Sequence, residues 1–471
     1  MTRGAGVVSG SGFPRRFGFS NLSTRKVGWR VFSVAQERLT PLVSPEQGAR
    51  PIIVVGSGSE FLSGISHYTH HLAIALAETR PVGVILMRKL IPAFLYPGRK
   101  RVGDQGLSSI TYPPHIPLFD GVDWNGGRSA RDAIKFIQQE HPRVVIFQWW
   151  TAAVSFNYVR LARAAIRAGA RVVIELHETQ DVGEAKLPFA GTVSKLALNH
   201  LLSISSGVVT HSSYDAESLL KMWRNPEKIE VAVIPHGPFT ELAMTAKSTC
   251  KVRPPGSPTR LLYFGVIRSY KGIDDLAAAY HELIRRGANV KLTVVGEPWG
   301  KEADHALLAL RQGPGAANVT VIDRFIADAE IPGLLQEADL LVLPYHRSSA
   351  SGPLALAMAA GLPVVTTSVP ALVEATAGYT GAVHVPVKSP EGLVEGIKTA
   401  LALVGTVHES RITWSAIGAR YAALFLEIER TTSVTGRDRP GRPIGRAMLR
   451  TWQWAAGFED RVRLLFRLGQ Q

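Results

Sequence analysis

The segment YFGVIRSYKGIDDL at residues 263–276 decides the fold expected for this chain. Its apolar start leads into Gly265, a short loop then carries Arg268 and Lys271, and helix-forming residues follow Gly272. This order predicts a strand, a basic loop and the N-terminus of a helix. Unpaired backbone N–H groups at a helix N-terminus favour anions, and two neighbouring cations suit a diphosphate. The alternative is an ordinary turn whose basic side chains are simply exposed to solvent.

Strand-like and helix-like segments alternate on both sides of this stretch, which is typical of parallel sheets covered by helices on both faces. We therefore predict an α/β protein with two doubly wound, Rossmann-like domains that face a central cleft. Strands are expected at residues 51–55, 82–87, 144–147, 171–176, 207–210, 231–234, 260–264, 291–295, 319–322, 340–343, 364–366 and 382–385. Helices are expected near residues 67–77, 154–168, 274–286, 305–312, 331–337, 353–360 and 390–403.

Changes in composition divide the 471 residues into five parts. The first, residues 1–50, is basic, rich in Gly and Ser, and expected to be mostly disordered. Residues 51–238 and 259–430 carry the two predicted domains, and the Pro-rich segment 239–258 links them. Residues 431–471 form a basic tail in which an apolar stripe predicts an amphipathic helix. That helix is expected either on a membrane surface or against the body of the protein.

Most of the formal net charge of +15 lies in the two tails. Eight Lys/Arg and two acids give residues 1–50 a charge of +6, and eight Arg and three acids give residues 431–471 a charge of +5. The body between the tails therefore carries only +4. This distribution argues against nucleic-acid binding and favours an anionic membrane surface as a partner of the tails.

The cysteine content and the distribution of apolar residues indicate the cellular compartment that we expect for the protein. The single cysteine, Cys250, excludes an intramolecular disulfide and is typical of a reducing environment. No stretch reaches the ~18 uninterrupted apolar residues of a membrane span, and the N-terminus lacks the apolar core of a secretory signal. We expect a cytoplasmic protein, with peripheral attachment to the inner face of the cell membrane as a further expectation. A basic, aromatic loop at residues 88–101 is a candidate contact for a lipid-linked phosphate, although a solvated loop has the same composition.

Five motifs in order give the chain a resemblance to a known family. They are the opening segment, the strand that ends at His177, IPHG at 234–237, ADLLVLPY at 338–345 and AMAAGLPVV at 357–365. In this order and spacing they resemble the GT-B glycosyltransferases, specifically the large retaining family 4. The resemblance covers roughly residues 51–430.

The resemblance implies that the C-terminal domain holds a nucleotide diphosphate sugar and that the N-terminal domain holds the acceptor. Arg268 and Lys271 fall on the family's diphosphate-binding residues, and His177 falls on the histidine that contacts the donor sugar near its anomeric carbon. The implied reaction retains the anomeric configuration, with the leaving phosphate as base, and needs no metal and no further cofactor. Two structural alternatives stay open: His177 caps its strand through Glu178, and residues 323–326 are a plain turn. The implied donor-binding residues are Gly64, Gly265, Arg268, Lys271, Ser351, Gly352, Pro353 and Leu354, and the nucleobase is expected near Arg324 and Phe325.

The chain departs from the family at a pair of glutamates. The family pattern E-G-F-G-x-P-x-x-E-A-M-A is replaced by SSASGPLALAMA at residues 348–359, so that Ser348 and Leu356 stand where the glutamates would be. Leucine cannot make the hydrogen bonds that the second glutamate makes to the ribose. Either the protein is a degenerate transferase, or it belongs to a branch that uses the turn and helix start at 351–354 instead. The retained Arg268, Lys271 and His177 favour the second account.

The sequence therefore predicts a hexosyltransferase, of the kind used in polysaccharide biosynthesis. It would move a hexose from a nucleotide diphosphate sugar to a glycan or lipid-linked acceptor. One alternative is a catalytically silent GT-B protein that binds a nucleotide or partners a transferase. The other is a UDP-sugar epimerase of the same fold, which would need an acid or histidine set in the C-terminal domain that we do not find in the sequence.

Overall fold

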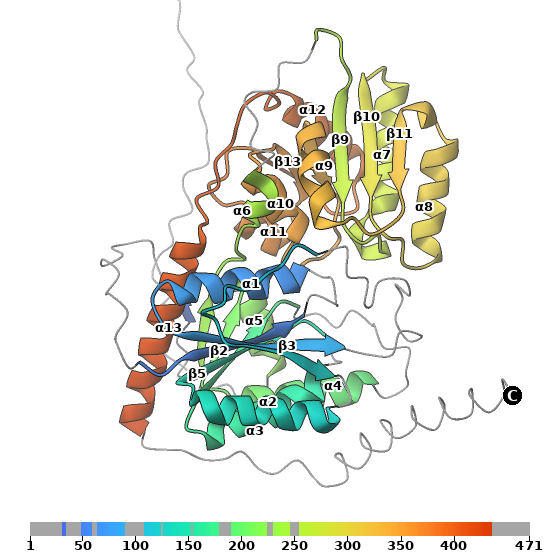
Figure 1. The fold of residues 1–471 in the computed structure, drawn as a ribbon. Helices are drawn as coiled ribbons and strands as arrows, with labels where there is room; N and C mark the ends of the chain where they lie inside the picture. The colour runs from blue at the N-terminus through green and yellow to red at the C-terminus, as the bar shows by residue number, and fades with distance from the viewer. Residues whose placement is uncertain are drawn as a thin grey trace, which may run out of the picture.

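The computed structural model describes residues 31–33, 49–58, 64–89, 108–123, 126–151, 154–178, 190–223, 229–244 and 254–435. These residues form two domains, one above the other in Figure 1, and each is a parallel sheet with helices on both faces. The predicted pair of doubly wound, Rossmann-like domains is confirmed.

The N-terminal domain is built on an eight-stranded parallel sheet with the order β1-β8-β7-β6-β5-β2-β3-β4. Its strands are β1 (Val31–Ser33), β2 (Ile52–Ser57), β3 (Val82–Lys89), β4 (Leu118–Asp123), β5 (Val144–Trp149), β6 (Arg171–Leu176), β7 (Gly207–Thr210) and β8 (Glu230–Val233). Its helices are α1 (Gly64–Ala77), α2 (Gly127–Glu140), α3 (Ser155–Arg167), α4 (Ala190–Ile204) and α5 (Ser213–Met222).

The C-terminal domain is built on a six-stranded parallel sheet with the order β11-β10-β9-β12-β13-β14. Its strands are β9 (Thr259–Phe264), β10 (Val290–Val295), β11 (Val319–Ile322), β12 (Leu340–Leu343), β13 (Val364–Thr367) and β14 (Ala382–Val385). Its helices and 3-10 turns are α6 (Thr240–Met244), η3 (Ser269–Lys271), α7 (Ile273–Arg285), α8 (Lys301–Gln312), η4 (Ala316–Asn318), η5 (Asp328–Glu330), α9 (Ile331–Glu337), α10 (Gly352–Ala359), α11 (Pro370–Ala375) and α12 (Pro390–Leu401).

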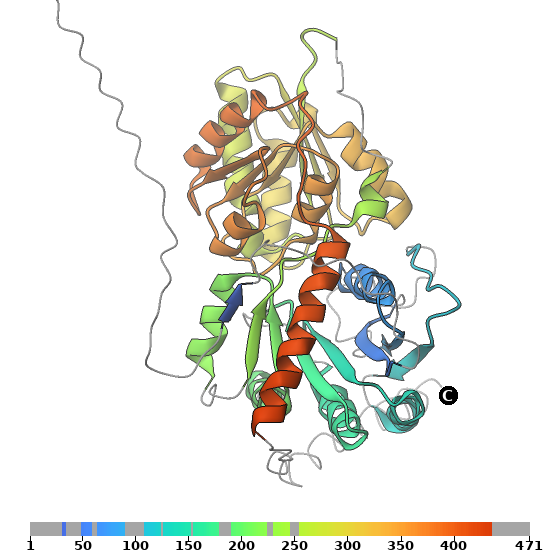
Figure 2. The ribbon, with the colours of Figure 1, turned by 90° about the vertical axis from the view of Figure 1, so that its left-hand side faces the viewer.

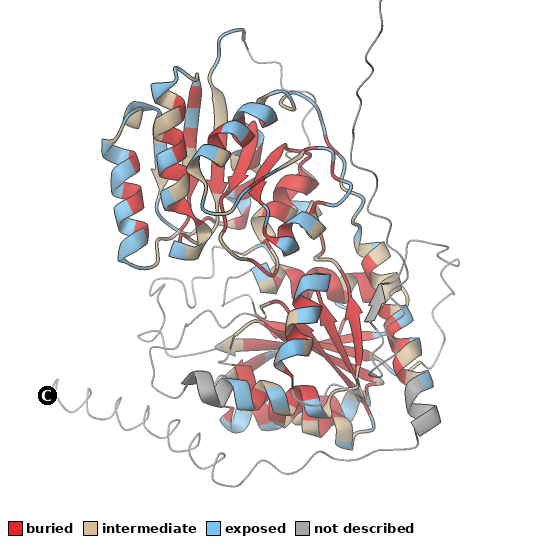
Figure 3. Ribbon diagram, turned by 180° about the vertical axis from the view of Figure 1, so that it is seen from behind, coloured by how far each residue is buried: buried red, intermediate tan, exposed pale blue. Residues whose placement is uncertain are grey.

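The central strands are buried along their whole length because helices cover both faces of each sheet. Every residue of β2, β5, β7 and β12 is buried, and Figure 3 shows the buried residues concentrated in the inner strands of the two sheets. A strand buried on both faces needs an unbroken apolar run rather than an alternating one. This requirement explains why runs such as Val-Val-Ile-Phe in β5 were visible in the sequence.

The last described helix, α13 (Trp414–Thr435), leaves the C-terminal domain and packs along the N-terminal one (Figure 2). Trp414 donates its indole N–H to the carbonyl of Pro238 at 2.6 Å, and Glu429 forms an ion pair with Arg143. A Cβ on Gly207 would lie only 2.8 Å from the Ile428 side chain. Helix α13 thus packs on α1 and β8 of the N-terminal domain, although the sequence predicts that residues 414–430 belong to the C-terminal domain.

Other elements differ from the sequence prediction. Strand β1 lies in the tail that was expected to be disordered, and it pairs in parallel with β8. Helix α6 lies inside the predicted linker and packs on α9 and α10. Most of the basic loop at 88–101 and the predicted amphipathic helix of the C-terminal tail lie outside the described residues. Within the described ranges, every helix is too short or too polar to cross a bilayer.

Candidate active site

Three cationic side chains gather beyond the ends of β9 and β12, which are neighbours in the C-terminal sheet. Two of them, Arg268 and Lys271, follow β9, and the third, Arg347, follows β12. Each lies against the face of an aromatic ring, an arrangement that attracts cations to the π system and holds them in place. The distances from cation to ring centroid are 3.8 Å for Arg268 over Trp299, 3.7 Å for Lys271 over Tyr345 and 4.7 Å for Arg347 over Tyr270.

The environment of Lys271 makes the cluster attractive to an anion. The pKa of Lys271 is lowered from 10.5 to about 7, chiefly by burial and also by the charges of Arg268 and Arg347, whereas the charge of Glu178 acts in the opposite direction. A lysine near its titration point at neutral pH marks a place where like charges are crowded and partly desolvated. A bound polyanion would relieve this repulsion. Glu178, on the turn after β6, is the acid of the N-terminal domain that acts on this cluster.

The two basic loops are locked to each other by backbone contacts. Gly272 has φ of 68°, and a Cβ there would lie 1.9 Å from the carbonyl oxygen of Pro344, so only glycine fits. The amide of His346 donates to the carbonyl of Tyr270 at 2.8 Å. The ring of His346 also bonds to Asp275, in the first turn of α7, at 2.7 Å. The cations are therefore carried by a rigid pair of loops.

The predicted donor-binding turn at the start of α10 lies beside this pair of loops. Gly265 has φ of 128°, and a Cβ there would lie 3.2 Å from Pro353. The first turn of α10 offers few donors, because proline has no N–H and the amide of Leu354 bonds to the Ser351 side chain at 3.3 Å. In the first turn of α10, the N–H group that remains to bind an anion is therefore that of Gly352.

The segment at residues 348–356, which lacks the two glutamates of the family pattern, makes its contacts within the protein. Ser348 donates its hydroxyl to the carbonyl of Ala350 at 2.8 Å, and Leu356 is buried among apolar side chains. Ser349 reaches across to the N-terminal domain, where its Oγ lies 3.0 Å from Asp215 and 3.4 Å from Glu178. A pocket between the domains runs past this segment, lined on the other side by His211, His236 and Pro238.

His177 lies at the end of β6, and both of its ring nitrogens are bonded within the N-terminal domain. Nε2 bonds to Oε1 of Gln148, and Nδ1 lies 3.0 Å from Nε2 of His211. Burial lowers the pKa of His177 well below its usual value, and the neighbouring His211 and His236 lower it further. The expected alternative partner, Glu178, is not among these ring contacts. Contact of His177 with a donor sugar stays a prediction.

Gly64 and the predicted nucleobase turn flank the cleft. Gly64 opens α1, is exposed, and would place a Cβ 4.0 Å from the nearest side chain, that of Phe239, so a ligand has room here. Arg324 is held by Glu330 at 2.9 Å, and the pKa of Glu330 is lowered to about 2, chiefly by its hydrogen bond with Arg324. Arg324 and Phe325 thus belong to a locally braced turn.

Polar contacts join the two domains on both sides of the cluster. Asp328, just beyond that turn, bonds to His67 at 2.9 Å and to the amide of Ser109 at 2.8 Å. Glu374 accepts from the amide of Ser213, at the start of α5, at 2.8 Å. A carboxylate at a helix N-terminus is favourably placed. These contacts hold the two domains against each other.

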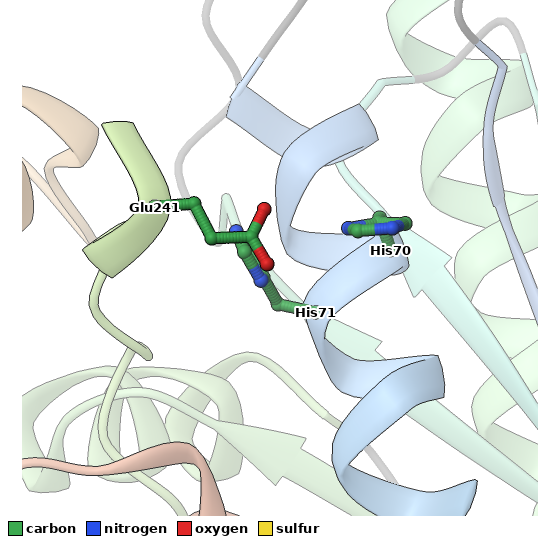
Figure 4. Close-up of side chains that lie close together, drawn as sticks. All are labelled: His70, His71 and Glu241. Carbon is green, nitrogen blue, oxygen red and sulfur yellow. The ribbon is translucent and has the colours of Figure 1, made fainter. Parts of the chain in front are cut away.

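Among the residues that the structure describes, two sets of side chains come close enough to suggest a metal, namely Glu175 with His177 and His211, and His70 with His71 and Glu241. Figure 4 shows the second set, in which Glu241 reaches from α6 toward α1. Successive helix residues diverge by ~100°, and Nε2 of His70 already lies 3.0 Å from the carbonyl of Thr111. We assign no metal to either set, and the expectation that none is needed stays a prediction.

Residues 258–402 match the family described as Glycosyl transferases group 1. Among curated proteins, the chain is 28% identical to D-inositol 3-phosphate glycosyltransferase of Segniliparus rotundus, over 46% of this chain and 51% of the relative. It is 25% identical to glycogen synthase of Mycobacterium tuberculosis, over 74% and 84% of the two chains. It is 33% identical to GDP-mannose:glycolipid 4-beta-D-mannosyltransferase of Xanthomonas campestris, over 23% and 30%. The chain thus spans about half the length of the first of these relatives.

Solved structures agree on the fold. Sucrose-phosphate synthase from Thermosynechococcus elongatus superposes with a TM-score of 0.54 at 16% identity, over 82% of this chain and 98% of that one. The Anabaena protein HepE, in complex with UDP and glucose, gives 0.53 at 17% identity, over 82% and 100%. The fold is GT-B, and the matched domain together with the curated relatives supports a glycosyltransferase.

Proposed function

We propose that this protein is a retaining glycosyltransferase that moves a hexose from a nucleotide diphosphate sugar to a glycan or lipid-linked acceptor. The observation that carries the proposal is the cluster of Arg268, Lys271 and Arg347 on two locked loops at the cleft. Its chemistry fits a diphosphate, which carries two negative charges along a short chain. HepE, which shares the fold, was solved with UDP and glucose.

The cluster would act on the leaving group. As the bond from the anomeric carbon to the phosphate oxygen breaks, negative charge grows on the diphosphate, and preorganised cations stabilise it. The acceptor hydroxyl then attacks the same face, and its proton passes to the leaving phosphate oxygen. This route needs no protein carboxylate at the anomeric carbon, which accords with the absence of acidic side chains at 348 and 356.

Donor binding should depend on pH through Lys271. Its pKa in the free protein is about 7, below the usual 10.5, so above pH 7 the free side chain has lost the proton that a bound diphosphate requires. We expect the affinity for UDP-glucose or GDP-mannose to fall by up to about tenfold for each pH unit above 7. Calorimetry in buffers of different ionisation enthalpy should also show uptake of about one proton on binding at alkaline pH.

The matched control for this titration is Lys271→Arg, because arginine stays protonated throughout this range. Its affinity for the sugar nucleotide should be nearly independent of pH. Both phosphates of a sugar nucleotide are esterified, so the ligand itself releases no proton near neutral pH. The same pH dependence in both proteins would remove Lys271 from the diphosphate site.

A silent GT-B protein is the second candidate function, and the segment at 348–356 favours it. Ser348 and Leu356 offer the donor sugar and ribose no carboxylate, and the hydroxyl of Ser348 is already bonded to Ala350. Thermal-shift screening with UDP-, GDP- and ADP-sugars separates the candidates when it is followed by an assay for release of the nucleoside diphosphate. Stabilisation by a sugar nucleotide without any turnover would favour the silent protein.

We also infer that the basic C-terminal tail attracts an anionic membrane that presents a lipid-linked acceptor. Because α13 extends to residue 435, deletion of 436–471 removes eight arginines and three acids without cutting the helix. The truncated protein should co-sediment less with vesicles that contain anionic lipid, since each cation near such a surface contributes about 1 kcal/mol. Neutral vesicles are the control, and unchanged co-sedimentation with anionic vesicles would contradict the inference.

A further inference from the structure

A buried chain of hydrogen bonds runs from Glu175 to the backbone of Ile234, just after β8. Gln148 bonds to Glu175 through Nε2 at 2.6 Å and to Nε2 of His177 through Oε1. Nδ1 of His177 lies 3.0 Å from Nε2 of His211, and Nδ1 of His211 lies 3.0 Å from the carbonyl oxygen of Ile234. Glu175 and Gln148 are completely buried, and the two histidines are 6% exposed. Such a chain has to satisfy every donor and acceptor internally.

The partners at the two ends fix where the protons lie. Gln148 donates its amide N–H to Glu175, so its oxygen accepts from His177, and Nε2 of His177 carries a proton. A neutral His177 then has an acceptor at Nδ1, which faces Nε2 of His211. Since Nδ1 of His211 faces a carbonyl oxygen, which only accepts, both nitrogens of His211 are required to donate. The bonding pattern therefore describes an imidazolium.

A counterion is in place for this charge. Oε1 of Glu175 lies 3.8 Å from Nε2 of His211, and Glu175 also accepts the hydroxyl of Tyr68 at 2.6 Å. The other titratable groups around the pair are His236, whose ring centroid is 5.3 Å from that of His211, and Tyr421 of α13. Burial raises the pKa of Tyr421 and lowers that of His236, so both are neutral. Glu175 is thus the anion that faces His211.

We propose that Glu175 and His211 form a buried ion pair that fixes His177 at the cleft with its proton on Nε2. Glu175 and His211 are then positioning residues for His177. The ion pair itself does not depend on the proposed glycosyltransferase function; only the expected effect of these residues on turnover rests on it. In this arrangement the carboxylate of Glu175 accepts two hydrogen bonds and the imidazolium of His211 donates two. A buried ion pair is stable when its charged groups form hydrogen bonds in this way. An imidazolium has no lone pair for a metal, so this set of side chains binds none while the pair is intact.

The competing arrangement has the same number of protons and no charges. In it Glu175 is protonated and donates to a rotated Gln148 amide, and every bond along the chain to His211 is reversed. The two forms differ at observable positions, because the proton missing from Nε2 of His211 appears on the carboxyl of Glu175. The proton positions on Glu175 and His211 therefore distinguish the two forms.

Neutron diffraction from crystals of the full chain in D₂O tests the proposal without substrate or substitution. We expect deuterons on both nitrogens of His211 and on Nε2 of His177, and none on Glu175. A deuteron on Glu175, or a single deuteron on His211, would overturn the ion pair. Because the result does not depend on turnover, an inactive protein would leave this conclusion intact.

Solution NMR of the imidazole nitrogens adds the positioning test at neutral pH. Glu175→Gln should move one nitrogen of His211 to the shift of an unprotonated nitrogen and change the tautomer signal of His177. The control His305→Gln removes an exposed histidine of α8 and should change neither. If the protein transfers sugar, Glu175→Gln should lower kcat by about 10–100-fold, as is typical when the hydrogen-bond partner of a metal-bound histidine is removed, with the KM for the donor little changed. Unaltered His177 signals in a folded Glu175→Gln protein would refute the positioning role.

Discussion

Arg268→Ala and Lys271→Ala are each expected to lower kcat/KM for sugar transfer by about 10²–10³-fold, with the fold intact. Both side chains lie on the loop between β9 and α7, where Arg268 contacts the ring of Trp299 and Lys271 contacts the ring of Tyr345. Their removal leaves the charge that develops on the departing diphosphate without its nearest cations. The measurement is steady-state turnover with the donor that stabilises the wild-type protein most, accompanied by circular dichroism and thermal unfolding.

The matched control is Arg285→Ala. Arg285 is an exposed cation at the last turn of the same helix that follows the basic loop, and its partner is Glu282. Its removal changes the net charge as much as the other two substitutions do, but away from the cleft, so turnover should stay close to wild type. Full activity in either Arg268→Ala or Lys271→Ala would contradict the diphosphate assignment.

Leu356→Glu, which restores the second glutamate of the family pattern, should destabilise the protein by about 3–5 kcal/mol without improving donor binding. Leu356 is 4% exposed and lies in the apolar core of the C-terminal domain, where a carboxylate has no partner. A buried carboxyl has a raised pKa, so the loss measured by urea unfolding should shrink as the pH falls.

Leu356→Met is the control for this substitution, because a swap that conserves volume costs less than ~1.5 kcal/mol. The outcome that would contradict the account is a Leu356→Glu protein of native stability that binds sugar nucleotides more tightly. That result would place residue 356 at the proposed donor site rather than in the core.

Twelve of the fourteen described strands could be predicted closely from the sequence, whereas β1, β4 and the strand order could not. Strand β12 has the predicted bounds because a fully buried parallel strand requires an unbroken apolar run. The packing of α13 on the N-terminal domain was not predicted, because an apolar helix face in a sequence does not identify the element against which it packs. Strand β1 was missed because three residues are too few to show a pattern.

The same limit applies to the site. Arg268 and Lys271 were found because they share one loop, whereas Arg347 belongs to the cluster only because β12 lies next to β9 in the sheet. Likewise, the partners of His177 come from β5 and from the end of β7, the two strands that flank β6. Sheet order brings these residues together, and a single sequence does not contain that order.

Arg347 changes how the missing glutamates are understood. It stands immediately before Ser348, so the segment that lost a negative side chain carries a positive one beside it. If the proposed donor site is correct, this loop presents a cation to the donor, while its serine side chains bond to the loop itself and to the N-terminal domain. On this account the protein holds its donor chiefly through the diphosphate and less through the ribose and the sugar.

A crystal structure of the full chain with bound UDP tests this claim most directly. The account predicts that the diphosphate lies between Arg268 and Lys271, within hydrogen-bond distance of both and beside Arg347 and the amide of Gly352. A diphosphate bound elsewhere, with Arg268 and Lys271 still on their aromatic rings and without contact to phosphate, would contradict it.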